Sequence, residues 1–241
     1  MNASAMPSHR RISLAAGIAY VLTFVSIPTL ALYDAVKSPR YILGGGSDRA
    51  ADLGGLLEIT VALAGIATAV ILFPILKKQN ESLALGLVAA RILESGTIFA
   101  GVAFLLSVVT LRQEGAGTGA LATSHVLVAL YDRIFLLGQS FMPAVCDLLL
   151  GYMLYRSRLV PRQLSVIGLV GAPVLVLGYL AVLFGAIDQH SGLAGLSALL
   201  VAVFELSLGL WLIVKGFDGD AVAALERRSR LDQDQGTAAT G

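Results

Sequence analysis

The chain has 241 residues, of which 56% are hydrophobic and only 14% are charged, and its formal net charge is +1. Soluble domains carry roughly 25% charged residues, so this composition excludes a water-soluble globular protein and makes the lipid bilayer the expected partner. A net charge so close to zero also excludes the strongly positive surface by which proteins attract nucleic acid, so no nucleic-acid partner is expected.

Six apolar segments follow one another along the chain, each long enough to cross a membrane. The hydrocarbon core of a bilayer is about 30 Å thick, and a helix needs roughly 20 apolar residues to span it. The six segments are 12–32, 53–76, 83–110, 133–155, 164–186 and 193–214. They predict an all-α fold, a polytopic bundle of six transmembrane helices in one membrane domain, 12–217.

The N-terminal segment, 1–11, places His9, Arg10 and Arg11 directly before the first apolar segment, as in a secretory signal. The apolar segment that follows exceeds the roughly 7–15 residues of a signal peptide. The first segment is therefore predicted to be retained as a membrane span.

Three connecting or terminal segments leave alternatives open. The first predicted outer loop, 33–52, carries three glycines at 44–46 and is either a flexible linker or a lid. A shorter apolar piece, about 120–131, either lies in the membrane interface or extends the fourth span. The C-terminal segment, 218–241, is predicted to be a cytoplasmic, partly disordered tail that begins with a short amphipathic helix.

Basic residues outside the spans are divided unevenly between the two sides of the predicted membrane. Eleven lie on the N-terminal side: Arg10, Arg11, Lys77, Lys78, Arg156, Arg158, Arg162, Lys215, Arg227, Arg228 and Arg230. Four lie on the other side: Lys37, Arg40, Arg49 and Arg112. Because cytoplasmic loops carry an excess of Lys and Arg, a multi-pass protein of the cell membrane with both termini in the cytoplasm is predicted. Aromatic anchors are expected near the outer face, among them Tyr33, Tyr41 and Tyr131.

A central group of ionisable residues is predicted from depth along the spans. At about 1.5 Å of rise per residue, Arg91, Asp147 and Glu205 lie at similar depths near the membrane centre, with Glu94 one turn further out. Arg91 and Glu94 are three residues apart and can pair on one helix. One fixed positive charge then faces three carboxyl groups, so the group is either a neutralised clasp between helices or a binding site for a ligand, ion or proton.

A second, outer polar group is formed by Glu58, Asp132, Arg133 and Gln139. The acids Glu58, Glu94, Asp147 and Glu205 share their helix faces with Ala and Gly, and small residues mark the surfaces where membrane helices meet. Pro143 removes a backbone donor and frees the carbonyl of Gln139, which indicates either a packing kink or the border of a binding site.

Three motifs carry a resemblance to a known family. Residues 148–157 read LLLGYMLYRS and 159–162 read LVPR, 91–94 read RILE, and 204–216 read FELSLGLWLIVKG. With these motifs the chain, over nearly all of 10–217, resembles domain of unknown function 4386, a family of bacterial multi-span membrane proteins. The resemblance implies an integral membrane protein and implies no activity. Arg133 departs from the pattern, which has an aromatic residue there.

No catalytic, metal or cofactor site is predicted, and the chain is not expected to be an enzyme. The three histidines, His9, His125 and His190, are scattered, and neither Ser140 nor Cys146 has an evident base partner. Cys146 is expected to act as a small buried apolar residue.

Two hypotheses of function remain. The first is a small transporter-like protein with an intramembrane site for a proton, cation or ligand. The second is a structural or sensory interaction partner whose buried charges only lock the helices. A homo-oligomer is compatible with both hypotheses, and nothing in the sequence identifies a ligand.

Overall fold

The computed structural model describes residues 8–239, with side chains described for 8–231, and within these limits the chain is all helical. The elements are α1 (Ser8–Leu22), the 3₁₀ turn η1 (Thr23–Ser26), α2 (Thr29–Leu32), α3 (Asp34–Lys37), α4 (Asp48–Leu76), α5 (Glu81–Gln113), the 3₁₀ turn η2 (Gly117–Ala120), α6 (Leu121–Phe135), the π turn η3 (Leu136–Phe141), α7 (Met142–Ser157), α8 (Arg162–Leu183), α9 (Gly192–Val214) and α10 (Gly219–Ala239).

Among the described residues, six helical segments are long and apolar enough to cross a membrane, which confirms the predicted all-α polytopic bundle. They are Ser8–Leu32, Asp48–Leu76, Glu81–Gln113, Gly117–Ser157, Arg162–Leu183 and Gly192–Val214. Large apolar side chains such as Leu30, Leu177 and Val214 are 72%, 67% and 68% exposed. A soluble protein would bury such residues, so this surface is suited to contact with lipid.

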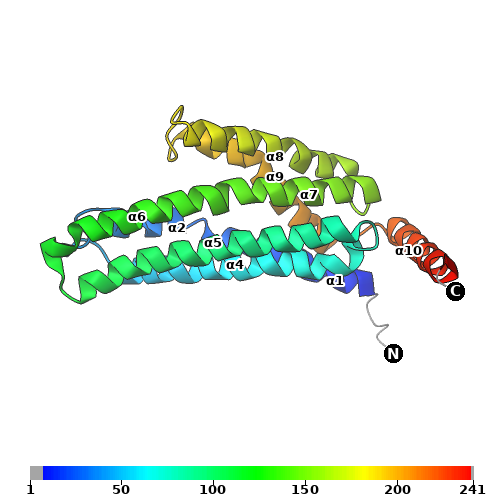
Figure 1. The fold of residues 1–241 in the computed structure, drawn as a ribbon, viewed down its shortest axis with the longest axis horizontal. Helices are drawn as coiled ribbons and strands as arrows, with labels where there is room; N and C mark the ends of the chain where they lie inside the picture. Colours follow the sequence, from blue (N-terminus) through cyan, green and yellow to red (C-terminus); the bar gives the residue numbers. More distant parts are fainter. Residues whose placement is uncertain (1–7, 240–241) are drawn as a thin grey trace.

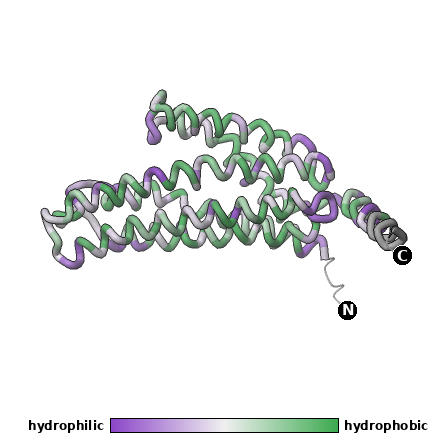
Figure 2. The backbone as a smooth tube through the Cα atoms, viewed as in Figure 1, coloured by the Kyte–Doolittle hydropathy of each residue, from purple (hydrophilic) through white to green (hydrophobic). Residues whose placement is uncertain are grey.

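The spans form a closed ring in which neighbours in sequence are neighbours in space and the last span meets the first. Contacts join α1 to α4, α4 to α5, α5 to both α6 and α7, α7 to α8, α8 to α9, and α9 to α1. Figure 1 shows these helices as nearly parallel rods, with α10 projecting beyond one end. We call the end at which α1 begins and α9 ends the terminal face, and the other end the distal face. In Figure 2 hydrophilic residues gather mainly at these two ends, and hydrophobic residues dominate between them.

The first span is broken, although the sequence predicts it as one segment. The α-helix stops at Leu22, the chain continues as the 3₁₀ turn η1, and α2 begins directly after Pro28. Proline lacks an amide donor and clashes with the preceding turn of a helix, which explains a break at this point. Four residues at the break, Thr23, Phe24, Ser26 and Ile27, line a cavity described below.

The apolar piece predicted at 120–131 extends the fourth span, and the interface alternative is not adopted. Helix α6 runs without a gap through the π turn η3 into α7. The π turn ends two residues before Pro143, which occupies the first turn of α7. Gly138 lies so close to Thr97 of α5 that a Cβ atom there would overlap the threonine hydroxyl.

Hydrogen bonds join the end of α5 to the connection between α3 and α4. The guanidinium of Arg112 donates to the carbonyl oxygens of Gly44, Gly45 and Gly46 at 3.3, 3.2 and 3.1 Å. It also pairs with Asp48 at the start of α4, at 3.0 Å. The three glycines predicted as a linker or lid therefore serve as acceptors that tie the connection between the first two spans to the third.

Several helix boundaries follow from local capping. The Asn80 side chain accepts from the amide of Leu83 at 2.9 Å and starts α5, and Ser191 accepts from Ala194 at 3.3 Å and starts α9. Both contacts satisfy amides that a helix leaves free at its beginning. Helix α7 ends at Arg158, whose φ of 59° is left-handed. That conformation usually belongs to glycine at this position.

The first and last spans approach most closely at two glycines. A Cβ atom on Gly17 would lie 2.6 Å from the carbonyl oxygen of Gly209. One turn away, the Arg10 guanidinium donates to the carbonyls of Leu212 and Ile213 at 2.8 and 2.5 Å. Small residues permit such backbone contact between membrane helices, and it closes the ring.

Helix α10 occupies most of the segment that was predicted as a partly disordered tail. Residues 240–241 of that tail, and 1–7 of the predicted N-terminal segment, lie outside the described residues. Val222 and Leu225 of α10 are buried against the core at the terminal face. Lys78 binds Glu226 at 2.8 Å. The hydrogen bond from Lys78 lowers the pKa of the Glu226 carboxyl, so this attraction is present at neutral pH and is lost as the pH falls through the lowered value.

Candidate functional site

Three of the four predicted central residues, Arg91, Glu94 and Glu205, form one ion-pair cluster inside the ring. The Arg91 guanidinium donates to the two carboxylate oxygens of Glu94 at 3.2 and 3.0 Å, within α5. Its other terminal nitrogen donates to Glu205 on α9, so the cluster joins the third and sixth spans. The three side chains are only 4%, 11% and 13% exposed. Removing one member of so buried a pair leaves an uncompensated charge, which is costly.

The fourth predicted residue, Asp147 on α7, lies beside the cluster without joining its hydrogen bonds. It is fully buried, and the charges of Glu205, Arg91 and Glu94 act on it. Neither of its carboxyl oxygens has a hydrogen-bond partner among the residues that the structure describes. The arrangement thus brings three carboxyl groups to one guanidinium, with a local excess of acid.

Two further side chains complete the surroundings of the cluster. The Cys146 thiol lies 3.5 Å from a carboxylate oxygen of Glu94 and donates to it. The Arg91 guanidinium carbon lies 5.8 Å from the ring centre of the fully buried Tyr20, within cation–π range. From the sequence Cys146 is expected only to fill space, and Tyr20 is not assigned to the cluster at all.

A cavity of about 230 Å³ lies against the distal side of the cluster, and residues from all six spans line it. Its polar wall is formed by Arg91, Glu94, Glu205, Ser95 and Gln139. The remaining lining residues are Thr23, Phe24, Ser26, Ile27, Val61, Gly65, Ile98, Pro143, Leu175, Ala198, Val201 and Ala202. The break in the first span and the start of α7 at Pro143 both border this space.

An apolar core closes the ring on the other side of the cluster. Each of α1, α4, α5, α7 and α9 contributes apolar residues from its part nearer the terminal face to one buried cluster. Its large members include Leu72, Leu76, Leu87, Leu150, Met153, Leu154, Leu208 and Leu212. The ion-pair cluster therefore forms the floor of a cavity that is sealed toward the terminal face.

The predicted outer polar group separates into two parts. Glu58 is 1% exposed and accepts three hydrogen bonds: from Tyr131 at 2.9 Å, from Tyr33 at 3.3 Å and from Gln139 at 3.4 Å. Glu58 and Gln139 are thus brought together as predicted. Because Gln139 also lines the cavity, it connects this second cluster with the first.

Asp132 and Arg133 do not join Glu58. Asp132 pairs with Lys37 at 2.8 Å, and the Lys37 ammonium lies 4.4 Å from the ring centre of Tyr131. Arg133 is exposed and borders a separate opening of about 460 Å³ at the distal face, which Asp188 also lines. Adjacent residues of a helix point about 100° apart, so Asp132 and Arg133 contact different parts of the protein although they are neighbours in sequence.

The prediction of aromatic anchors at the outer face was wrong for three residues. Tyr33, Tyr41 and Tyr131 are 3%, 0% and 3% exposed, so they do not contact lipid. Tyr33 and Tyr131 instead donate to Glu58, and their rings meet edge to face with centres 5.6 Å apart. An acid inside a span needs hydrogen-bond donors at the same depth. This requirement, applied to Glu58, could have identified Tyr33 and Tyr131 from the sequence.

Comparison with known proteins gives one match. A family model described as "Domain of unknown function (DUF4386)" matches residues 15–216. No curated protein and no solved structure matches.

Proposed function

Because the chain belongs to the DUF4386 family, whose description assigns no activity, we propose a function from the site itself. The protein is a small transporter-like membrane protein. Its cluster around Arg91 takes up and releases a proton as a small solute occupies the cavity. The observation that carries this proposal is the cavity of about 230 Å³ whose floor is the ion-pair cluster. A site that only locked helices together would need no cavity beside it.

The excess of acid supports a proton as the exchanged species. One guanidinium faces Glu94, Glu205 and the unpartnered Asp147. Three carboxylates cannot all stay charged beside a single cation in a low-dielectric interior, so one must be protonated or matched by another cation. We take the protonated carboxyl as the proposal, and the comparison of sodium with potassium salts below tests the cation.

The closed core supports a cycle in which the cavity faces one side of the membrane at a time. Transporters of many folds bind substrate near the bilayer midplane and expose it alternately to the two sides. Here the cavity reaches the cluster on its distal side, and leucines fill the ring between the cluster and the terminal face. In the proposed cycle this arrangement is one end state.

The orientation that completes this proposal has both termini in the cytoplasm of the cell membrane, so that the cavity faces outward. Reporter fusions after Lys78, Leu159 and Gly216 should give cytoplasmic signals, because the excess of basic residues lies on that side. Fusions near Gly45 and Gly117 should give external signals. An external signal from the fusion after Gly216 would refute the orientation.

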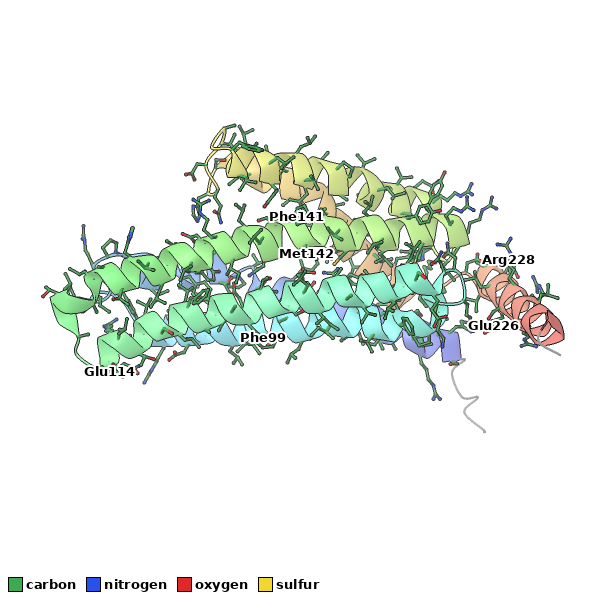
Figure 3. All side chains as sticks on the ribbon, viewed as in Figure 1. Phe99, Glu114, Phe141, Met142, Glu226 and Arg228 are labelled. Atoms are coloured by element: carbon green, nitrogen blue, oxygen red, sulfur yellow. The ribbon has the colours of Figure 1, made fainter. Side chains whose placement is uncertain are left out.

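The proton site is tested by thermal unfolding of the purified protein across pH, in sodium and in potassium salts. The wild type is expected to show a melting temperature that changes with pH and that does not depend on which cation is present. Glu94→Gln preserves the shape of the side chain and removes its ionisation, so this variant should fold and lose much of the pH response. The matched control is Glu114→Gln, because Glu114 is exposed at the end of α5 (Figure 3), twenty residues beyond Glu94.

Three results would contradict the proposal. A melting temperature that Glu94→Gln leaves equally sensitive to pH would place proton uptake elsewhere. A wild-type protein indifferent to pH and salt would leave the cluster as a clasp between helices, the alternative function. A response to sodium alone would replace the proton by a metal cation.

A further inference from the structure

A second cavity, separate from the Arg91 cluster, lies at the terminal face between α10 and the ends of α7 and α8. Its volume is about 800 Å³. Its walls carry four arginines and two aspartates: Arg156, Arg158, Arg162, Arg228, Asp218 and Asp220. The remaining wall includes Tyr152 and Tyr155. Figure 3 labels Arg228 on the part of α10 that adjoins the bundle.

The arginines in this cavity outnumber the aspartates and form no ion pairs with them. None of the four arginines forms an ion pair with any side chain in 8–231. The carboxylate of Asp218 accepts from the amide of Ala221 at 2.9 Å and so is used to begin α10. Arg162 lies over the ring of Tyr155 at 4.9 Å, which orients it without neutralising it. The cavity is a concentration of guanidinium groups, the side chains that best bind phosphate.

Arg158 is held in a backbone conformation that disfavours it. Its φ of 59° lies in the left-handed region, which is less favourable for a residue with a Cβ atom than for glycine. The helix end alone would be better served by glycine. The arginine at this position contributes to two cavities, because it also borders an adjoining space of about 610 Å³ with Trp211 and Lys215.

The surroundings of the cavity favour a membrane lipid as the molecule that would bring a phosphate group to these arginines. The cavity lies where α7 ends and α8 begins, at the boundary of the membrane-spanning segments. Apolar side chains beside it face outward: Tyr152 is 46%, Val166 41% and Val214 68% exposed. Trp211 borders the adjoining space, and tryptophan is typical of the membrane–water interface. Basic pockets at this depth bind the headgroups of anionic lipids.

We propose that the arginine cavity between α10 and the α7–α8 connection binds the phosphate group of an anionic membrane lipid. The acyl chains lie along the exposed apolar surface of the neighbouring spans, and α10 forms one wall of the headgroup site. The shared chemistry is a phosphate held by several guanidinium groups, and a soluble phosphate is the competing source. This site does not depend on the function proposed for the Arg91 cluster.

Binding is measured on the full-length protein in an uncharged detergent, with short-chain phosphatidylglycerol, short-chain phosphatidylcholine or inorganic phosphate added. Bound lipid is counted by native mass spectrometry, and affinity is taken from the rise in melting temperature with concentration. Phosphatidylglycerol should bind and stabilise the protein, and phosphatidylcholine and inorganic phosphate should do so far less.

Two variants and a matched control locate the site. Arg228→Ala should weaken phosphatidylglycerol binding by roughly fivefold, the effect of one basic residue at an anionic membrane surface. Arg158→Gly should weaken it similarly, and without lipid it should melt no lower than the wild type, because glycine suits the left-handed position. The control is Arg227→Ala: Arg227 is exposed on the same helix and does not line the cavity, so binding should be unchanged.

Three results would overturn the proposal. Equal losses in Arg227→Ala and Arg228→Ala would mean that basic residues attract the lipid without a defined site. Equal binding of phosphatidylcholine and phosphatidylglycerol would remove the role of the arginines. Inorganic phosphate binding as tightly as the anionic lipid, with the same sensitivity to Arg228→Ala, would make the site one for a soluble phosphate and refute the lipid.

Discussion

Replacing Arg91 by leucine is expected to destabilise the bundle by about 3–5 kcal/mol, the usual effect of removing one partner from a buried ion pair. The guanidinium compensates Glu94 and Glu205 at once, and all three side chains are nearly inaccessible to water. Without it, the two carboxylates face each other and Asp147 in a low-dielectric interior. Thermal or denaturant unfolding in detergent measures the loss.

A double-mutant cycle shows whether Arg91 and Glu205 are direct partners. Glu205→Leu alone should also destabilise, since Arg91 then keeps only Glu94. The combined variant should recover part of the summed loss, because coupled residues are not additive. Losses that simply add would refute direct pairing. Lys37→Met is a matched control, because the side chains of Lys37 and Asp132 are about a quarter exposed. Loss of this pair should lower the free energy of unfolding by at most about 1 kcal/mol.

Substitution of Gly17 by alanine is expected to have the second large effect, through packing alone. The added carbon would lie 2.6 Å from the carbonyl oxygen of Gly209 and 2.9 Å from the amide nitrogen of Ile213. Both are backbone atoms, so α1 and α9 must move apart to accommodate it. Overpacking of this kind typically costs about 1–3 kcal/mol, and it should appear as a lower melting temperature.

Gly96→Ala provides the comparison for this substitution. Gly96 lies within α5, and a Cβ atom there would meet nothing within 4 Å. Alanine favours helix more than glycine does, so this variant should be as stable as the wild type or more stable. Gly17→Ala should also disturb the Arg91 cluster, because Glu205 precedes Gly209 by one turn of α9. Equal melting temperatures for the two alanine variants would show that the ring is not closed by the contact at Gly17.

The six spans were predictable because length and hydropathy are properties of each segment alone. The pairing of Arg91 with Glu94 and the burial of Glu58, Glu94 and Asp147 were also predictable, since helical spacing fixes which residues share a face. Small neighbours on those faces indicated contact with other helices.

What could not be predicted depends on how different spans meet. Tyr20 of α1 lies beside Arg91 of α5 only when the ring is closed by α1 and α9. The periodicity within α1 or α5 alone does not predict this contact. The roles of Tyr33 and Tyr131 as donors to Glu58 require three spans to be placed first. The cavity likewise arises only from the break at Thr23–Ser26 and the space between six helices.

The π turn at Leu136–Phe141 also sets a rotational phase between the two ends of the fourth span. Over the sixteen residues from Tyr131 to Asp147, an uninterrupted α-helix would leave the two side chains about 160° apart, on opposite sides. A π turn accommodates one surplus residue and reduces that angle to about 60°. Both side chains can therefore face the interior, where Tyr131 meets Glu58 and Asp147 lies beside Arg91. One extra residue keeps the two polar clusters in phase, and straightening the turn would swing one of them toward lipid.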